Sequence, residues 1–182
     1  GELTIRWTVR LAVICYAAVL ALAIARRESP ASSRLSRAIW SLGCLLFLTH
    51  VLSAFAFYHH WSHQHAFDDT RDKTEAAIGL AFGWGIYVNH LFALLWVGDV
   101  AWSWAATESY RRRPWQVTAA LHAFMLFIAA NGLMVFKDGV IRWVSLTVLL
   151  LLLTAWIGTL TFRRNASADR LERAPRDEAS PT

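Results

Sequence analysis

The chain has 182 residues, of which 56% are hydrophobic and 17% are charged, and its formal net charge is +5. A soluble core of this size buries less apolar surface than this composition supplies, so the composition indicates an integral membrane protein. The basic excess needs no nucleic-acid partner, because no basic patch interleaved with aromatic residues occurs in a soluble segment. We expect the lipid bilayer, with its anionic lipids, to surround these cations.

Five apolar segments are long enough to cross a bilayer as helices: 7–25, 38–58, 76–104, 115–136 and 140–162. They predict an all-α fold, a compact bundle of five transmembrane helices in one domain over 1–164. The first segment has the position of a signal peptide, but Arg26 and Arg27 follow it without a small-residue cleavage site, so we expect a retained span. Asp72 and Glu75 have capping-box spacing, which predicts that the third helix begins near Asp72.

Basic residues concentrate in three segments that this topology brings to one side: 26–37, 111–113 and the tail from residue 163. Lys and Arg near span ends favour the cytoplasmic side. The sequence thus predicts an external N-terminus, a cytoplasmic C-terminus with a mobile tail over 165–182, and an external histidine-rich loop over 59–75. Arg6 and Arg10 depart from this pattern. The expected location is the bacterial inner (plasma) membrane.

Two predicted spans each carry one histidine near mid-membrane, His50 and His90. Counted from the cytoplasmic boundary, both lie roughly 20 Å deep at about 1.5 Å per residue. A polar side chain at that depth is costly without a partner, and imidazole is a common metal ligand. Small residues accompany both histidines on their helix faces: Gly43 and Ser53 near His50, and Gly79 and Gly83 on the face of His90.

This arrangement suits a haem b held by two histidines, because the porphyrin edges must pass close to helix backbone. The alternative is ordinary packing, since Gly79 and Gly83 also form a small-residue helix-packing pattern and an interhelical histidine hydrogen bond stabilises a bundle. His122 lies too shallow to join the pair, and we expect it to be a polar residue with satisfied hydrogen bonds.

Asp99 is the one acidic residue inside a predicted span. It lies half a turn from His90 around the helix, so a direct pair between these two is not expected. We expect an arginine of the 111–113 segment, or a partner subunit, to contact the Asp99 carboxylate.

The predicted external loop carries four histidines: His59, His60, His63 and His65. If the preceding helix extends, His59 and His63 share one face, whereas an extended chain aligns His63 with His65. Either geometry suits copper or zinc, and Asp68 and Asp69 are candidates to complete a mixed nitrogen and oxygen site. The alternative is an exposed hydrophilic loop whose imidazoles titrate near pH 6.5.

No motif of hydrolytic or nucleotide chemistry occurs in the sequence. We favour a small membrane redox or metal-binding subunit, such as a haem-b electron-transfer anchor, over a stand-alone enzyme. The alternatives are an accessory or structural subunit of a larger membrane complex, and an external copper or zinc site for metal delivery or oxidative chemistry. The expected partners are other membrane subunits or a redox partner.

Overall fold

The computed structural model describes residues 1–24 and 30–136, together with the single positions 147, 150, 154 and 158. Within these residues the structure has six helices and no strand, which confirms the all-α prediction for this part of the chain. Nearly all of the predicted fifth span, 140–162, and the whole predicted tail, 165–182, lie outside the described residues.

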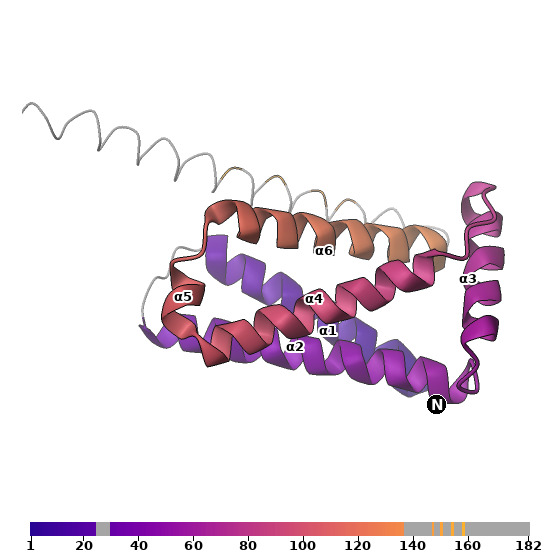
Figure 1. The fold of residues 1–182 in the computed structure, drawn as a ribbon, viewed down its shortest axis with the longest axis horizontal. Helices are drawn as coiled ribbons and strands as arrows, with labels where there is room; N and C mark the ends of the chain where they lie inside the picture. The colour runs from indigo at the N-terminus through magenta and orange to yellow at the C-terminus, as the bar shows by residue number, and fades with distance from the viewer. Residues whose placement is uncertain (25–29, 137–146, 148–149, 151–153, 155–157, 159–182) are drawn as a thin grey trace, which may run out of the picture.

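Four long helices lie side by side and form the body of the molecule (Figure 1). Successive long helices run in opposite directions, so the N-terminus lies at the same end as the end of α2. The helix α3 crosses that end, and the short α5 lies at the opposite end. The bounds are α1 (Glu2–Ile24), α2 (Pro30–Phe57), α3 (His63–Ile78), α4 (Gly85–Ala105), α5 (Thr107–Arg111) and α6 (Trp115–Phe136).

Helix starts follow local sequence signals. Pro30 occupies the first position of α2. Proline is favoured there because the first backbone N–H of a helix has no intrahelical acceptor, so its absence costs no hydrogen bond. Ser62 precedes α3, and its hydroxyl accepts a hydrogen bond from the backbone N–H of His65 at 3.1 Å. Pro114 precedes α6, and its carbonyl accepts the N–H of Val117 at 3.0 Å.

The third predicted span, 76–104, is not one continuous helix. α3 ends at Ile78, and Gly79 follows in the left-handed conformation with φ 73°. The Gly79 N–H donates to the carbonyl of Glu75 at 2.8 Å, a helix cap that favours glycine. α4 starts only at Gly85, so the predicted helix start near Asp72 is wrong, and most of the predicted 59–75 loop is helical.

Two of the described helices are long and apolar enough to cross a membrane, over Glu2–Ala23 (22 residues) and Ser33–Phe57 (25 residues). They correspond to the first two predicted spans. α4 has 21 residues, but its polar side chains Asn89, His90 and Asp99 lower its hydropathy. The described part of the chain is therefore an all-helical bundle with two candidate membrane spans.

Aromatic side chains dominate the core between the long helices. Trp40 on α2 and Trp96 on α4 approach to 4.9 Å between ring centroids. Gly43 admits Trp96 against α2, because a Cβ at Gly43 would lie 3.0 Å from both Trp96 Cζ2 and Cys15 Cβ. All four long helices contribute to the buried cluster, which comprises Ala12, Tyr16, Leu20, Trp40, Cys44, Phe92, Trp96, Met125 and Leu126.

A buried carboxylate joins three elements near the α5 end. Asp99 on α4 accepts hydrogen bonds from Trp40 Nε1 at 2.9 Å, Tyr110 Oη at 2.9 Å and Arg113 Nη1 at 2.5 Å. Burial, and secondarily the Asp99 charge, raises the pKa of Tyr110, so this hydroxyl keeps its proton and donates. The predicted contact between Asp99 and an arginine of the 111–113 segment is confirmed.

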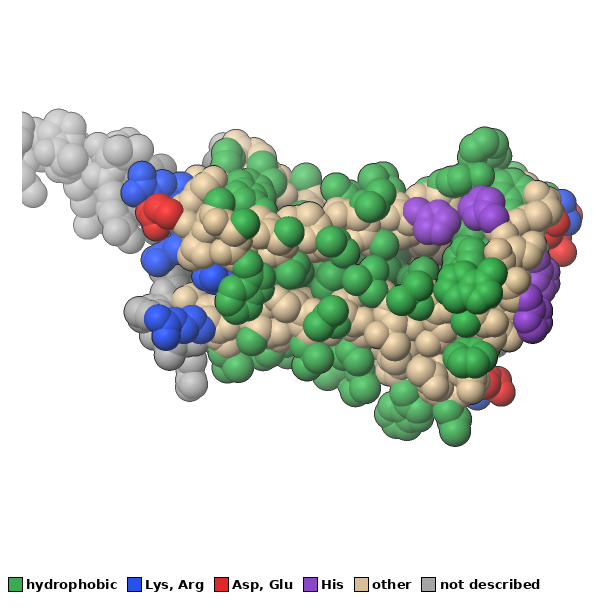
Figure 2. All heavy atoms as spheres, turned by 60° about the horizontal axis from the view of Figure 1, so that its bottom comes forward, with side chains coloured by type: hydrophobic (Ala, Val, Ile, Leu, Met, Phe, Trp, Pro, Cys, Tyr) green, Lys and Arg blue, Asp and Glu red, His purple; other side chains and the backbone are tan. Residues whose placement is uncertain are grey.

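Large apolar side chains are exposed along each of the four long helices. Leu11 is 40% exposed, Leu45 61%, Leu94 69% and Phe127 55%. Figure 2 shows hydrophobic side chains along the length of one face, with Lys and Arg gathered at one end and His at the other. The two ends of the bundle thus differ in chemistry, and the middle is apolar.

Candidate metal-binding site at the histidine-rich end

A tight turn between α2 and α3 brings the histidines together. His60 and Trp61 both have positive φ, 49° and 60°, a conformation that side-chain-bearing residues seldom adopt. The Trp61 N–H donates back to the carbonyl of Phe55 at 2.8 Å, and the Ser62 N–H donates to the carbonyl of His59 at 2.8 Å. Strained backbone of this kind concentrates at functional sites.

The turn places His59 beside His65, and we call these two residues the His59–His65 pair. Their ring centroids lie 5.4 Å apart at an interplanar angle of 82°. Tyr58 packs on both rings, edge to face with His59 at 5.0 Å and stacked on His65 at 6.3 Å. The two residues are six positions apart in the sequence, a spacing that neither predicted chain geometry anticipated.

The Nδ1 atom of His59 is buried and has no hydrogen-bond partner among the described residues. A buried polar atom without a partner costs free energy, and a metal ion or a water molecule relieves that cost. Burial also lowers the pKa of His59 below its ordinary value of 6.5, an effect that the Asp69 charge partly offsets. His59 is therefore neutral at pH 7, the protonation state that binds metal.

A second histidine pair links α3 to α4. His63 stacks on His90 with ring centroids 5.8 Å apart, and the Nε2 atom of His63 lies 3.1 Å from Tyr87 Oη. His90 also contacts the ring of Phe55 at 6.0 Å. His90 thus faces the histidine-rich end of the molecule.

His50 has different partners. Its Nδ1 atom lies 2.8 Å from the backbone carbonyl of Ile5, and its ring packs on Phe47 at 6.2 Å. Donation from Nδ1 to a carbonyl leaves Nε2 with the lone pair that a metal needs. No ring contact joins His50 to His90 in the described part of the chain.

The small residues of the haem hypothesis are dispersed. Gly79 and Gly83 lie in the connection between α3 and α4 and not on the helix of His90, so the expected shared helix face is wrong. A Cβ at Gly83 would lie 2.5 Å from the Phe67 ring, so this glycine serves the packing of α3. Gly43 packs against Trp96, and Ser53 is buried on α2.

The acidic residues near the histidines are held mainly by basic neighbours on α3. Asp68 pairs with Arg71 at 3.1 Å, and Asp69 pairs with Lys73 at 2.7 Å. Asp69 also accepts a hydrogen bond from Tyr58 Oη at 3.3 Å. His60 is exposed on the turn. Within the described residues, no group of three or more His, Cys, Asp or Glu side chains is arranged to hold a metal ion.

His122 belongs to a separate aromatic cluster near Asp99. Its ring stacks on Tyr16 at 5.8 Å and tilts toward Trp40 at the same centroid distance. Tyr16 Oη lies 3.4 Å from His122 Nδ1, which agrees with the expectation of a satisfied polar residue. Tyr16 and Trp40 were not predicted as neighbours of His122. The signal in the sequence is an aspartate inside an apolar segment, because its carboxylate needs donors such as an indole or a phenol.

Chemically, the histidine-rich end offers two imidazole pairs with different environments. The His59–His65 pair has a buried nitrogen that no described residue hydrogen-bonds, whereas the second pair contacts a tyrosine hydroxyl. Two imidazoles supply half of a tetrahedral coordination shell and leave positions for water or an exchanging ligand.

Comparison of the sequence and structure with protein-family models, curated proteins and solved structures finds no match.

Proposed function

We propose that this protein is a membrane-embedded helical subunit whose histidine-rich end binds a copper or zinc ion through the His59–His65 pair. The observation that carries the proposal is the buried Nδ1 atom of His59, which has no hydrogen-bond partner among the described residues and lies in a ring 5.4 Å from that of His65. Imidazole nitrogen is a good ligand for both metals.

Exposed apolar side chains support the membrane part of the proposal. Each long helix exposes large apolar side chains, and charged and histidine side chains gather at the two ends (Figure 2). Monomeric soluble proteins seldom expose apolar patches that continue along a whole bundle. Lipid chains cover such a surface at no desolvation cost, and the polar ends then reach the two aqueous phases.

The incomplete ligand set favours metal exchange over a structural role. Structural zinc sites use four protein ligands, whereas sites for delivery or reaction keep open positions. Asp69 lies near the pair, and the Lys73 ammonium and the Tyr58 hydroxyl now occupy its oxygens. Because no third ligand is arranged beside the pair in the described residues, the proposed site has two protein ligands and exchangeable positions for water or a small ligand.

The bis-histidine haem hypothesis stays a prediction. His50 presents Nε2 after its Nδ1 contacts the Ile5 carbonyl, which fits an iron ligand. His90, however, packs on His63 and not on His50, so the described contacts favour the metal site at the turn.

The test is metal content and titration on the full chain purified in mild detergent. We expect zinc or copper to bind with one equivalent per chain, and the double variant His59→Gln with His65→Gln to lose this binding. His60→Asn is the matched control, because His60 lies on the same turn outside both pairs and asparagine tolerates its positive φ. Equal loss in the control, or no metal binding by the parent protein, contradicts the proposal.

An absorption spectrum of the same sample separates the haem hypothesis from this one. A Soret band that His50→Ala or His90→Ala abolishes, with no effect of the His59 and His65 variants, assigns the chemistry to haem. A colourless protein that binds zinc or copper through His59 and His65 assigns it to the turn.

A further inference from the structure

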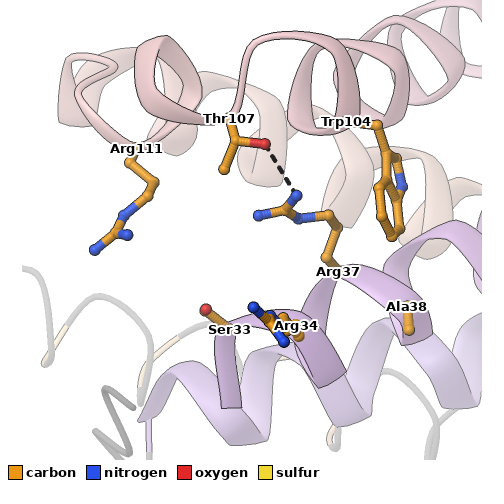
Figure 3. Close-up of a pocket in the computed structure, with 7 residues that line it drawn as sticks. All are labelled: Ser33, Arg34, Arg37, Ala38, Trp104, Thr107 and Arg111. Atoms are coloured by element: carbon orange, nitrogen blue, oxygen red, sulfur yellow. Dashed lines mark hydrogen bonds between the residues drawn. The ribbon is translucent and has the colours of Figure 1, made fainter. Parts of the chain in front are cut away.

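A cavity of about 560 Å³ opens at the end of the bundle opposite the histidines (Figure 3). It lies between the first turns of α2, the end of α4 and the short α5. Figure 3 shows Arg34 and Arg111 on opposite sides of the opening, with Arg37 reaching between them. The lining residues are Ser33, Arg34, Arg37, Ala38, Trp104, Thr107 and Arg111.

Three arginines at this cavity have no carboxylate partner among the described residues. Their neighbours in sequence are paired, since Arg112 contacts Glu108 at 2.8 Å and Arg113 contacts Asp99. Arg34, Arg37 and Arg111 therefore bring three positive charges to one cavity, and no carboxylate of the described residues neutralises them there. Like charges repel, and a bound anion relieves that repulsion.

Arg37 is held in a fixed orientation at the cavity. Its Nη1 atom donates to Thr107 Oγ1 at 3.0 Å, and its guanidinium lies 5.1 Å from the centroid of the Trp104 ring. The planar guanidinium binds phosphate oxygens in a forked geometry, and a guanidinium already in place loses less entropy on binding.

An apolar groove of about 270 Å³ continues from this cavity between α2 and α4. Trp104 lines both, and its indole N–H donates to Ser41 Oγ at 2.9 Å where the two meet. On α2 the lining residues follow one helix face, from positions 34, 37 and 38 in the cavity to 41, 44, 45 and 48 in the groove. An arginine-lined cavity thus lies beside an open apolar groove, with Trp104 lining both.

We propose that this site binds one anionic phospholipid, with its phosphate between Arg34, Arg37 and Arg111 and one acyl chain in the groove. The cavity alone fits any phosphate-bearing anion, but the apolar groove attached to it fits a lipid chain and offers nothing to a free anion. Basic pockets between helices at a membrane boundary are suited to anionic headgroups. The inference rests on the membrane part of the proposed function and is independent of the metal site.

The test uses the full chain in detergent, with phosphatidylglycerol, phosphatidylcholine or inorganic phosphate added. Native mass spectrometry counts bound lipid, and thermal unfolding reports stabilisation. We expect phosphatidylglycerol to bind more tightly than phosphatidylcholine. Each arginine near an anionic headgroup contributes about 1 kcal/mol, so removing one weakens phosphatidylglycerol binding about fivefold.

The variant Arg34→Gln with Arg111→Gln changes two exposed residues of the cavity. Arg112→Gln is the control at the same end outside the cavity, and it removes one positive charge where the double variant removes two. We expect the double variant to lose the preference for phosphatidylglycerol and the control to keep it. Equal loss in both assigns the effect to general surface charge and overturns the proposal.

The groove has its own test. Ala101→Trp fills it from α4, and Leu94→Trp introduces the same side chain at an exposed position outside it. We expect only Ala101→Trp to weaken phosphatidylglycerol binding. Stabilisation by inorganic phosphate alone equal to that by phosphatidylglycerol identifies a free anion as the ligand and overturns the lipid proposal, while leaving the metal titration unaffected.

Discussion

The guanidinium of Arg113 lies 2.5 Å from the carboxylate of Asp99, and both side chains are almost fully buried, with 11% and 6% exposed. Trp40 and Tyr110 donate two further hydrogen bonds to the same carboxylate. The Asp99 carboxylate therefore ties α4 to α2, to α5 and to the link before α6, and loss of one partner of the ion pair leaves the other charge buried.

Asp99→Asn is expected to destabilise the protein strongly. Breaking a buried ion pair by removing one partner costs about 3–5 kcal/mol, because the remaining charge stays buried. Glu108→Gln is the control, since its ion pair with Arg112 is 68% and 79% exposed. Such exposed pairs contribute about 1 kcal/mol or less. Thermal unfolding in detergent measures both, and equal effects of the two variants contradict the structural role of Asp99.

Trp40→Phe isolates one hydrogen bond of the network. Phenylalanine keeps an aromatic ring in the core but removes the N–H that donates to Asp99 at 2.9 Å. A hydrogen bond to a charged group contributes about 1.5–3 kcal/mol. Trp104→Phe removes a similar bond to the neutral Ser41 hydroxyl at 2.9 Å, on an exposed side chain. We expect a clearly larger drop in unfolding temperature for Trp40→Phe, and the reverse order contradicts this assignment.

Gly83→Ala tests the packing of α3 against the start of α4. The added methyl group would lie 2.5 Å from the Phe67 ring, so that ring must move, and overpacking of this kind costs about 1–3 kcal/mol. Gly98→Ala is the control, because nothing lies within 4 Å of its Cβ position. Hydrogen exchange of the α3 amides should accelerate in the first variant alone. Unchanged exchange in Gly83→Ala shows that α3 is held without this contact.

Metal affinity at the turn should fall as the pH falls. A protonated imidazole has no lone pair for the metal, so protons compete for the site. Burial lowers the pKa of His59 below 6.5. Protons therefore displace metal from His59 at a lower pH than they would from a free histidine. Zinc titrations across this range measure the effect, and affinity that does not change with pH excludes histidine ligands.

The same pKa has a consequence for stability without metal. The unfolded chain binds a proton at His59 more tightly than the folded chain does, so acid favours the unfolded state. We expect the His59 contribution to be lost progressively as the pH falls from about 6.5 toward the lower folded-state pKa. The unfolding temperature of the parent protein should therefore fall more steeply with decreasing pH than that of His59→Gln, and parallel curves contradict this expectation.

Sequence reasoning succeeded where composition or charge alone decides the outcome. The apolar content predicted helices, and the cost of an unpaired carboxylate predicted a contact between Asp99 and an arginine of the 111–113 segment. The end of α3 at Gly79 was not predicted. Residues 76–104 are apolar over a length that suits one transmembrane helix, and a single glycine within such a segment is a weak sign of a helix end.

The pairing of the histidines was not predictable from spacing. Counting residues along a helix predicts how deep a side chain lies in the bundle. It does not predict which neighbouring helix that side chain faces. His50 and His90 were expected at one level, yet they contact Ile5 and His63, respectively. His59 meets His65 through a turn with two left-handed residues that carry no glycine signal.

Arg113 follows Asp99 by 14 residues, and this order matters during synthesis. At roughly 5–20 residues per second, the ribosome produces α4 about one to three seconds before it produces the partner of its buried charge. During that interval the donors of the finished network are the neutral groups of Trp40, made earlier, and of Tyr110, made three residues before Arg113. The buried carboxylate of α4 therefore obtains its countercharge only after α5 and the residues that follow it have been made.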